Sequence, residues 1–368
     1  MLSNPQPGKI SRKGRRPLSS GPSLSIVIPT WNGLELLEKH LPSVIDAAEA
    51  YRQKLGASYE ILLVDDGSTD STIEHFRQNP IPHLRVISLP LNRGFAATCN
   101  QGFREAKYAL VGLLNNDVEI DPDYFIHHAE HFRDPLTFAV TARVYHPGSR
   151  IFNTGGRFAG FRRGFWSVYF NYDFLPGSHA QEWIDNRKLL SFYAIGGFST
   201  FDREKLLEAG GFLEILSPFH WEDVDLSYRG WKRGWQIKYE PRSLAWHQAS
   251  STINTSFKKS KVETLSFKNR LLFHWVNLHS RPMLSLHLLS LGTMCILKVL
   301  CLDGRFFQAL GKALRQLPDA LKARSLERSQ AGRSDREVQR LLNDFYKSAP
   351  IRVYFGRDAI LEHHQDAK

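Results

Sequence analysis

The chain has 368 residues, a formal net charge of +11 and 42% hydrophobic residues, so it can build one large domain with an extension or two domains. The basic balance predicts an anionic partner, either nucleotide phosphates, nucleic acid or an acidic membrane surface. Its three cysteines, Cys99, Cys295 and Cys301, are too few for a disulfide scaffold and lack metal-ligand spacing, which favours a reducing, cytoplasmic setting.

The first residues of the chain do not form a secretory signal. Residues 1–22 are polar, rich in Pro, Ser, Lys and Arg, and lack an apolar stretch. They are therefore predicted to be a disordered basic tail, with the folded part beginning at residue 23.

The next stretch alternates between apolar runs and segments of helical spacing. Apolar runs predict short buried strands, and apolar residues three or four positions apart predict the helices between them. The first helix, over residues 34–51, is expected to kink or break at Pro42. Strands that alternate with helices indicate an α/β protein with a mostly parallel sheet. The four expected strands span residues 25–30, 60–64, 84–87 and 108–114.

Polar clusters follow three of these strands, at Asp65, Asn92 and Asn115. Ligands of parallel α/β sheets bind beyond the carboxyl ends of the strands, so these clusters predict a binding site. Asp66 can accept the imide N–H of a uracil or thymine ring, with an Asp-Gly turn as the structural alternative. The absence of a Gly-x-Gly-x-x-Gly after the first strand disfavours a dinucleotide oxidoreductase, and the absence of a P-loop motif excludes a P-loop enzyme.

Asp117 and His247 are candidate metal ligands. Asp117 follows a buried strand, and a hard oxygen ligand there suits Mg²⁺ or Mn²⁺ bridging to a diphosphate. His247 ends a later predicted strand, and an imidazole nitrogen is accepted more readily by Mn²⁺ than by Mg²⁺. A structural role for this single histidine is the alternative.

The middle of the chain is less regular. Residues 153–174 are rich in glycine, arginine and aromatic residues, and form either a substrate loop or a packed excursion. Further strands are expected at residues 192–201, 236–239 and 243–247, the last two separated by Pro241.

A helix is predicted to begin at Glu222 and Asp223 and to end near Gly230 or Gly234. Acidic residues are favoured at a helix N-terminus, where they face unpaired N–H groups and the positive end of the dipole. That is the structural alternative to a catalytic role for this pair, which follows an aromatic residue, Trp221, and three upstream polar clusters.

Taken in order, these motifs resemble family 2 glycosyltransferases of the GT-A fold, and most closely the bacterial rhamnosyl- and galactofuranosyl-transferase-like branch. Each piece is short, but together they cover roughly residues 24–251. The matching stretches are Ile26 to Asn32, Val64 to Asp70, Asn92 to Phe95 with Asn100 to Gly102, Leu114 to Asp117, Gly210 to Phe212, Trp221 to Leu226, and His247.

The resemblance implies a GT-A domain over residues 23–255, with a mixed, mostly parallel central sheet, and a helical, basic extension over residues 256–368. It implies inverting transfer of a sugar from a nucleotide-diphospho-sugar, with UDP or dTDP as the nucleotide, to a glycan or lipid-linked acceptor in cell-surface polysaccharide synthesis.

The resemblance also implies the role of each candidate residue. Asp223 would be the catalytic base, with Glu222 beside it, and Trp221 would either offer an aromatic face to the acceptor sugar or simply pack. Asp117 and His247 would hold Mn²⁺ or Mg²⁺, although Asn115 replaces the first Asp of the family's Asp-x-Asp motif and predicts modest metal affinity. The expected nucleotide-sugar-binding residues are Pro29, Thr30, Asn32, Asp66, Asn92, Gly94, Asn115 and Asn116.

The C-terminal third is apolar and basic. Residues 283–302 are almost long enough to span a bilayer, but His287 and Lys298 interrupt them. We therefore expect amphipathic helices lying on the anionic inner face of the cell membrane, with a single span or a packed helical cap as alternatives. Residues 325–336 are polar and expected to form a loop.

Two other functions compete with sugar transfer. A nucleotidyltransferase would require a glycine-rich, basic loop after the first strand, where the sequence has Trp31-Asn32-Gly33-Leu34. A non-catalytic basic module for nucleic acid or membrane would spread its charge over the sheet, whereas much of the charge here lies near the two ends. No nucleic-acid partner is therefore expected.

Overall fold

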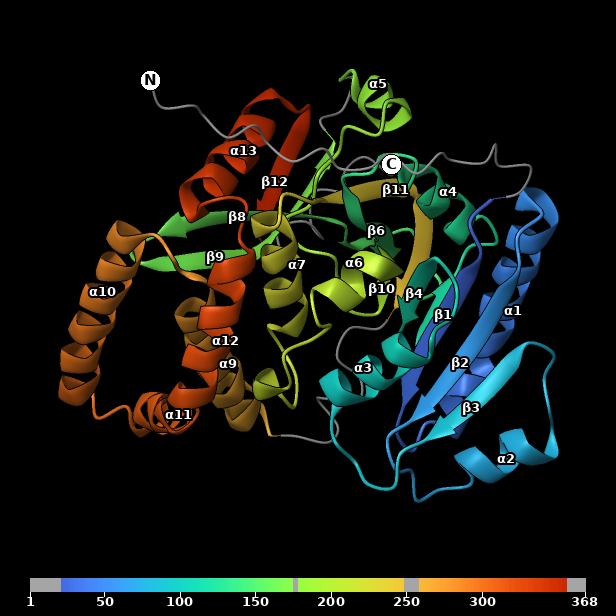
Figure 1. Cartoon of the computed structure of the whole chain (residues 1–368), viewed down its shortest axis with the longest axis horizontal. Helices are drawn as coiled ribbons and strands as arrows, with labels where there is room; N and C mark the ends of the chain where they lie inside the picture. Colours follow the sequence, from blue (N-terminus) through green and yellow to red (C-terminus); the bar gives the residue numbers. More distant parts are fainter. Residues whose placement is uncertain (1–20, 175–177, 248–257, 356–368) are drawn as a thin grey trace, which may run out of the picture.

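The computed structural model describes residues 21–174, 178–247 and 258–355. The expected disordered tail therefore lies almost wholly outside the described residues. Figure 1 shows a twisted sheet flanked by helices, with a group of C-terminal helices packed beside it.

The main sheet is mixed and mostly parallel, as predicted. Within the described residues its strands follow the order β3-β2-β1-β4-β10-β6-β11-β5, and β7 pairs with β6. Strands β10 and β5 run antiparallel to their neighbours in this order. The bounds are β1 (Leu24–Thr30), β2 (Tyr59–Asp65), β3 (Leu84–Ser88), β4 (Leu110–Leu114), β5 (Val118–Ile120), β6 (Thr137–Tyr145), β7 (Phe152–Thr154), β10 (Phe198–Asp202) and β11 (Gln236–His247).

The helices cover both faces of this sheet, which explains the unbroken apolar runs of β1, β2 and β4. Helices α1 (Leu34–Leu55) and α4 (Tyr124–His131) pack against each other, and α3 (Phe95–Glu105) contacts β1 and β2. The remaining helices of this part are α2 (Thr72–Gln78), α5 (Ala180–Asp185), α6 (Arg203–Glu208), the 3-10 turn η1 (Glu214–Leu216) and α7 (Glu222–Lys232).

Three predicted boundaries were wrong. Helix α1 is not broken at Pro42 and extends to Leu55, because Leu37, Leu41 and Val44 are buried on both sides of the proline. Strand β11 is continuous through Pro241, which lies at a register shift between Glu240 and Leu244, where a missing N–H is tolerated. Strand β10 begins at residue 198 instead of 192, and the preceding residues turn toward the cavity described below.

Most of residues 153–174 lie in a small second sheet, and residues 153 and 154 belong to β7 of the main sheet. Strands β8 (Gly156–Arg162) and β9 (Phe165–Phe174) make an antiparallel pair, and β12 (Ile351–Phe355) joins the outer edge of β9. A strand from near the end of the chain therefore completes this sheet, which Figure 1 shows beside α13 and α7.

The C-terminal region is helical, as expected. Helix α9 packs against α7, α11 and α12. The segment expected to be a loop is helical up to Gln330, and the next helix begins at Asp335, where Ser334 and Glu337 form a capping box. The helices are α9 (Lys259–Asn277), α10 (Arg281–Leu300), α11 (Gly304–Arg315), α12 (Leu317–Gln330) and α13 (Asp335–Ser348).

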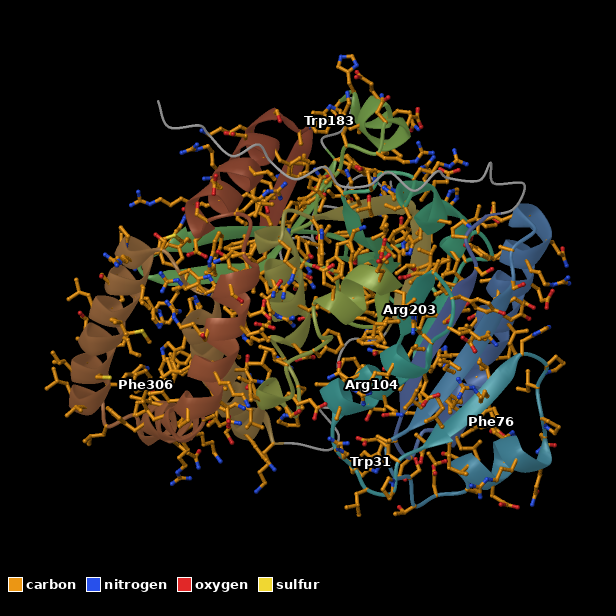
Figure 2. All side chains as sticks on the ribbon, viewed as in Figure 1. Trp31, Phe76, Arg104, Trp183, Arg203 and Phe306 are labelled. Atoms are coloured by element: carbon orange, nitrogen blue, oxygen red, sulfur yellow. The ribbon has the colours of Figure 1, made fainter. Side chains whose placement is uncertain are left out.

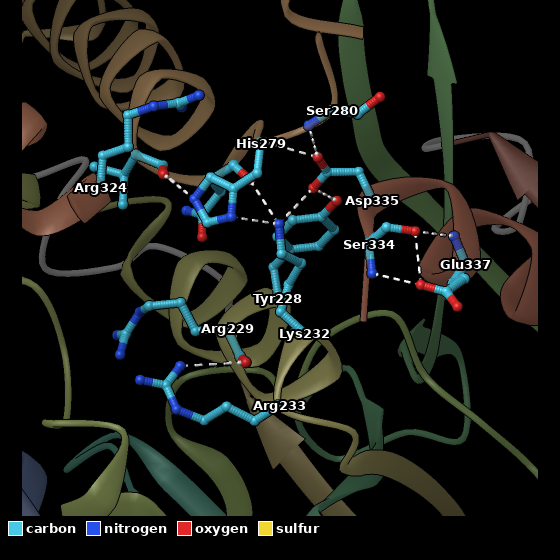
Figure 3. A network of polar contacts seen from close by, with 12 residues as sticks. Tyr228, Arg229, Lys232, Arg233, His279, Ser280, Arg324, Ser334, Asp335 and Glu337 are labelled. Atoms are coloured by element: carbon cyan, nitrogen blue, oxygen red, sulfur yellow. Dashed lines mark hydrogen bonds and ion pairs between the residues drawn. The ribbon is translucent and has the colours of Figure 1, made fainter. Parts of the chain in front are cut away.

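A buried polar network fixes the C-terminal end of α7 to this helical region (Figure 3). Lys232 forms an ion pair with Asp335 at 2.8 Å. Asp335 also accepts hydrogen bonds from the Tyr228 hydroxyl and from the N–H groups of His279 and Ser280. Because both charged groups are paired and hydrogen-bonded, their burial is compensated, and α7 is held in one position.

Candidate functional site

A cavity of about 760 Å³ opens where the parallel strands end. Figure 2 shows Trp31, which directly follows β1, at this edge of the sheet. The structure brings together nearly all the predicted site residues here. The cavity is lined by Pro29, Thr30, Asp66, Asn92, Gly94, Asn115, Asn116, Asp117, Trp221, Glu222, Asp223 and His247.

Asp66 organises the loop that follows β3. Its carboxylate accepts hydrogen bonds from the backbone N–H groups of Arg93 (2.7 Å) and Gly94 (2.8 Å). Gly94 has φ +86°, which favours glycine, and it directly precedes α3. Asp66 is buried yet still lines the cavity, so it combines the structural role with a position suited to a ligand.

Asn32 is not among the residues that line the cavity, although its neighbour Trp31 is, and its expected contact with the nucleotide stays a prediction. Its side-chain oxygen accepts hydrogen bonds from the backbone N–H groups of Thr69 (2.7 Å) and Asp70 (3.3 Å), and its own N–H donates to the Ser68 hydroxyl. Asn32 therefore shapes the loop after β2.

The residues after β4 form one wall of the cavity. Asn116 donates from its side chain to the Thr30 hydroxyl at 3.0 Å, which joins the ends of β4 and β1. The Asn115 side chain packs so closely on Gly197 that a Cβ there would lie 2.5 Å from it. Gly197 also has φ +101°, so only glycine fits both the contact and the backbone.

Asp117 and His247 come together from different strands. Asp117 Oδ1 lies 3.3 Å from His247 Nε2, and both side chains are mostly buried. A carboxylate oxygen and an imidazole nitrogen converging on one point fit Mn²⁺, and Mg²⁺ less well. The described residues contain no group of three or more His, Cys, Asp or Glu suited to a metal ion, so further ligands would have to come from water and a bound diphosphate.

The loop before α7 has an unusual backbone. His220 and Trp221 both have positive φ, at +72° and +78°, and such left-handed residues cost about 1–3 kcal/mol each. The amide of Asn269, on α9, donates to the carbonyl oxygens of Leu216, Phe219 and His220. A residue of the C-terminal helices therefore holds this strained loop in place.

Asp223 follows this loop in the first turn of α7 and lines the cavity. Asp223 Oδ2 accepts a hydrogen bond from Gly196 N–H at 3.1 Å, and Oδ1 accepts one from Val224 N–H at 2.7 Å. Burial raises the pKa of Asp223, while these two N–H groups and the charge of Arg157 oppose the rise.

Glu222 lies deeper than its neighbour. It is 8% exposed, and its Oε2 has no hydrogen-bond partner among the described residues. Burial, together with repulsion from Asp223, raises the pKa of Glu222 to about 8. Glu222 therefore carries its proton at neutral pH, and the two adjacent acids are suited to different tasks.

Trp221 lines the cavity but is largely packed, and its expected contact with an acceptor sugar stays a prediction. Trp221 is 3% exposed, and the centroid of its ring lies 5.2 Å from the centroid of the Phe273 ring. The guanidinium of Arg270 lies over the same ring at 5.8 Å. The packing supports the left-handed backbone at the start of α7.

Sequence reasoning missed a cavity wall formed by residues of β7, β8 and β9, within residues 153–174, and by Tyr193. Thr154 donates to the Asn171 side chain at 2.8 Å, and Asn153 donates to the His247 carbonyl oxygen at 3.1 Å. The signal was the concentration of arginine and aromatic residues in this stretch, which was left open between a substrate loop and a packed excursion. The missed residues are Asn153, Thr154, Arg157, Val168, Asn171 and Tyr193.

Comparison with known proteins agrees with this geometry. The family model described as glycosyl transferase family 2 matches residues 25–208, half of the chain. A poly-beta-1,6-N-acetyl-D-glucosamine synthase of Staphylococcus epidermidis is 27% identical over 242 residues, covering 64% of this chain and 52% of the relative. The chain therefore spans about half the length of this curated relative.

Solved structures of similar shape show the fold. GalNAc-T7, crystallised with UDP, GalNAc and Mn²⁺, superposes with a TM-score of 0.53 at 19% identity, over 70% of this chain and 48% of that one. S. aureus TarS residues 1–349, in complex with UDP-GlcNAc, gives a TM-score of 0.50 at 15% identity, over 88% and 91% of the two chains. The expected GT-A fold is confirmed.

Proposed function

We propose that this chain, which belongs to glycosyl transferase family 2, transfers a sugar with inversion from a nucleotide-diphospho-sugar to a hydroxyl of a glycan or lipid-linked acceptor. The observation that carries the proposal is one cavity that holds both Asp223 and the pair Asp117–His247. Family membership argues against the nucleotidyltransferase and nucleic-acid-binding alternatives.

The curated relatives support a role in cell-surface polysaccharide synthesis and a UDP-sugar donor. The named relative makes a polymer of N-acetylglucosamine, and the TarS structure contains UDP-GlcNAc. We propose UDP as the donor nucleotide, with dTDP as the alternative. Asp66 and the loop at Asn92 and Gly94, with Pro29 and Thr30, would bind the nucleoside, and Asn115 and Asn116 the sugar.

Asp223 is the proposed catalytic base. Inversion requires the acceptor hydroxyl to attack from the face opposite the leaving diphosphate, and a carboxylate on that face must accept the proton. The N–H groups of Gly196 and Val224 stabilise the ionised form and fix the carboxylate's orientation. Glu222, protonated at neutral pH, can donate a hydrogen bond to a sugar oxygen while Asp223 accepts the proton.

Asp117 and His247 are the residues that would hold a divalent metal, with Mn²⁺ favoured over Mg²⁺ by the imidazole. A metal bound there would neutralise charge on the leaving diphosphate. The hydrogen bond from Asn153 to the His247 carbonyl oxygen fixes the backbone of the imidazole-bearing residue.

We also propose that the protein binds the anionic inner face of the cell membrane through α10, with a cytoplasmic catalytic domain. By length and composition α10 could cross a membrane, and little of it is buried in the protein. However, His287, in the middle of α10, is buried and hydrogen-bonds to the Gly164 carbonyl oxygen at 2.9 Å. A crossing helix would pull that part of the second sheet into the bilayer, so a helix lying in the interface is favoured.

A donor screen tests the proposed function. Purified protein with Mn²⁺ is titrated with UDP, dTDP and GDP, and hydrolysis of the corresponding nucleotide-sugars is measured. We expect binding of one uridine or thymidine diphosphate that weakens when the metal is chelated. Metal-independent binding of every nucleotide alike would contradict the proposed donor site.

A further inference from the structure

Arg157 lies in the cavity wall on β8, in the stretch that sequence reasoning left open between a substrate loop and a packed excursion. Its backbone is fixed, since its N–H donates to the Ser191 hydroxyl at 3.0 Å and its carbonyl oxygen accepts from Phe192 N–H at 2.9 Å. Its guanidinium lies over the Tyr193 ring, 5.1 Å from the centroid. Both side chains line the cavity.

Arg157 is half-buried, and its contacts differ from those of three other buried or half-buried cations of the protein. Arg229 is paired with Asp225, Lys232 with Asp335, and Arg143 with Asp173. Within the described ranges Arg157 has no carboxylate in ion-pair contact, and its Nε is buried without a hydrogen-bond partner. A cation removed from water without a partner is unfavourable, so a position of this kind is suited to an anionic ligand.

The position of Asp223 indicates which ligand Arg157 faces. Arg157 is close enough to Asp223 for its charge to oppose the burial-driven rise in that residue's pKa. In an inverting reaction the base lies on the acceptor's side of the sugar, and the diphosphate leaves from the other side. An arginine beside the base therefore faces the acceptor and not the leaving group.

From this arrangement we propose that Arg157, stacked on Tyr193, binds an oxyanion carried by the acceptor near the reacting hydroxyl. This inference rests on the proposed function and names a property of its acceptor. A guanidinium presents parallel N–H donors that match a carboxylate or phosphate, and the aromatic ring fixes its plane. The oxyanion is either the carboxylate of a sugar acid or the phosphate of a phosphorylated or lipid-linked acceptor.

Two matched probe pairs test the proposal and separate its two sources. Glucuronate is compared with glucose, and glycerol 3-phosphate with glycerol, by ligand-observed NMR titration of the full chain with and without UDP and Mn²⁺. We expect one anionic probe to bind at least about tenfold more tightly than its neutral partner, as one charge-assisted bidentate contact provides. The anion that binds identifies the source.

Variants of two arginines on the same strand provide the control. Arg157→Gln should abolish the preference for the anion. Arg157→Lys should retain part of it, because lysine keeps the positive charge but lacks the parallel N–H donors of the guanidinium. Arg162→Gln removes an exposed arginine from the end of β8 and should bind the probes as wild type does. Thermal melts establish that each variant is folded.

Two outcomes overturn the proposal. In one, neither anion binds better than its neutral partner to the wild type. In the other, Arg157→Gln keeps the preference for the anionic probe and changes only how the rate of sugar transfer depends on pH. That result would make Arg157 a positioning residue for Asp223. Failure of UDP to bind the wild type, by contrast, would count against the proposed donor site, and the probe titrations without UDP would still report on Arg157.

Discussion

Glu222 and Asp223 are adjacent in sequence, but different contacts surround their carboxyl groups. Asp223 accepts two backbone N–H bonds that stabilise its charge, whereas Glu222 Oε2 has no partner among the described residues. Such a separation of two acids by environment is what general acid–base chemistry requires. Each of the two acids therefore gives one testable prediction.

Replacing Asp223 by Asn should nearly abolish transfer. The amide cannot accept the acceptor proton, and loss of a general base costs about 10²–10⁴-fold in rate. Donor affinity should stay within a few-fold, because the carboxylate acts on the acceptor. Steady-state kinetics combined with nucleotide titration measures both quantities, and a folded variant that turns over at the wild-type rate would remove Asp223 from the mechanism.

Replacing Glu222 by Gln should change how stability depends on pH. The folded pKa of about 8 lies above the ordinary value of 4.5. Between these values the unfolded chain releases the proton and the folded protein keeps it, so the free energy of unfolding falls as pH rises. Denaturant unfolding from pH 5 to pH 9 should show this fall in wild type and a weaker one in the variant.

The control for that experiment is Glu35→Gln, at an exposed position in α1. Its pH dependence should follow that of wild type. Parallel curves for wild type and Glu222→Gln would mean that Glu222 is ionised in the folded protein at neutral pH.

At the scale of elements, the loop before α7 depends on a helix that follows it by about fifty residues. Asn269 of α9 satisfies three carbonyl groups of this loop, and Lys268 donates to two more, those of Ile215 and Ser217. Burial lowers the pKa of Lys268 to about 8. The C-terminal helices thus form part of the site's support.

Replacing Asn269 by Ala should destabilise the protein by about 1–3 kcal/mol, because buried carbonyl groups lose their donor. The catalytic rate should fall more than donor affinity does, since the loop sets the position of Asp223 and not of the nucleoside residues. Unfolding and kinetic measurements on Asn269→Ala are compared with Asn186→Ala, which removes one bond at an exposed helix end. Equal effects of the two substitutions would contradict a specific role for Asn269.

Sequence periodicity predicted the parallel strands and the polar clusters at their ends, because these depend on local patterns. Sequence periodicity failed where contacts between residues far apart in the chain determine the structure. Pro241 was interpreted as a strand break, but pairing of β11 with β6 carries the strand past it. Trp221 packs against Phe273 of α9, a contact that the local sequence pattern does not contain. The role of Asn269 depends on contacts that no local pattern contains.

At the scale of the whole molecule, the catalytic cavity and the apolar surface of α10 belong to separate regions joined by α9. In Figure 1 helix α10 stands at the outer edge of the C-terminal helices, away from the main sheet. Several of its leucines are exposed, including Leu289 at 69% and Leu300 at 75%. A large exposed apolar surface beside basic residues is typical of a membrane-binding site.

The full-length protein should therefore bind vesicles that contain anionic lipid, bind neutral vesicles less, and be partly released by high salt. Each basic residue near the surface contributes about 1 kcal/mol, and salt screens that part. Substitution of both Leu289 and Leu300 by Glu should reduce flotation with vesicles, whereas Leu136→Glu, at another exposed position, should not. Release by detergent alone, and not by salt or alkaline carbonate, would show that α10 spans the bilayer.

The configuration of the product tests the central claim most directly. An α-linked nucleotide-sugar that carries the nucleotide identified by the screen is supplied with Mn²⁺ and an acceptor, and the new glycosidic bond is assigned by NMR. Attack by a hydroxyl activated by Asp223, from the face opposite the diphosphate, predicts a β-linked product that is lost in Asp223→Asn. An α-linked product, or a β-linked product formed equally well by the variant, would contradict this account.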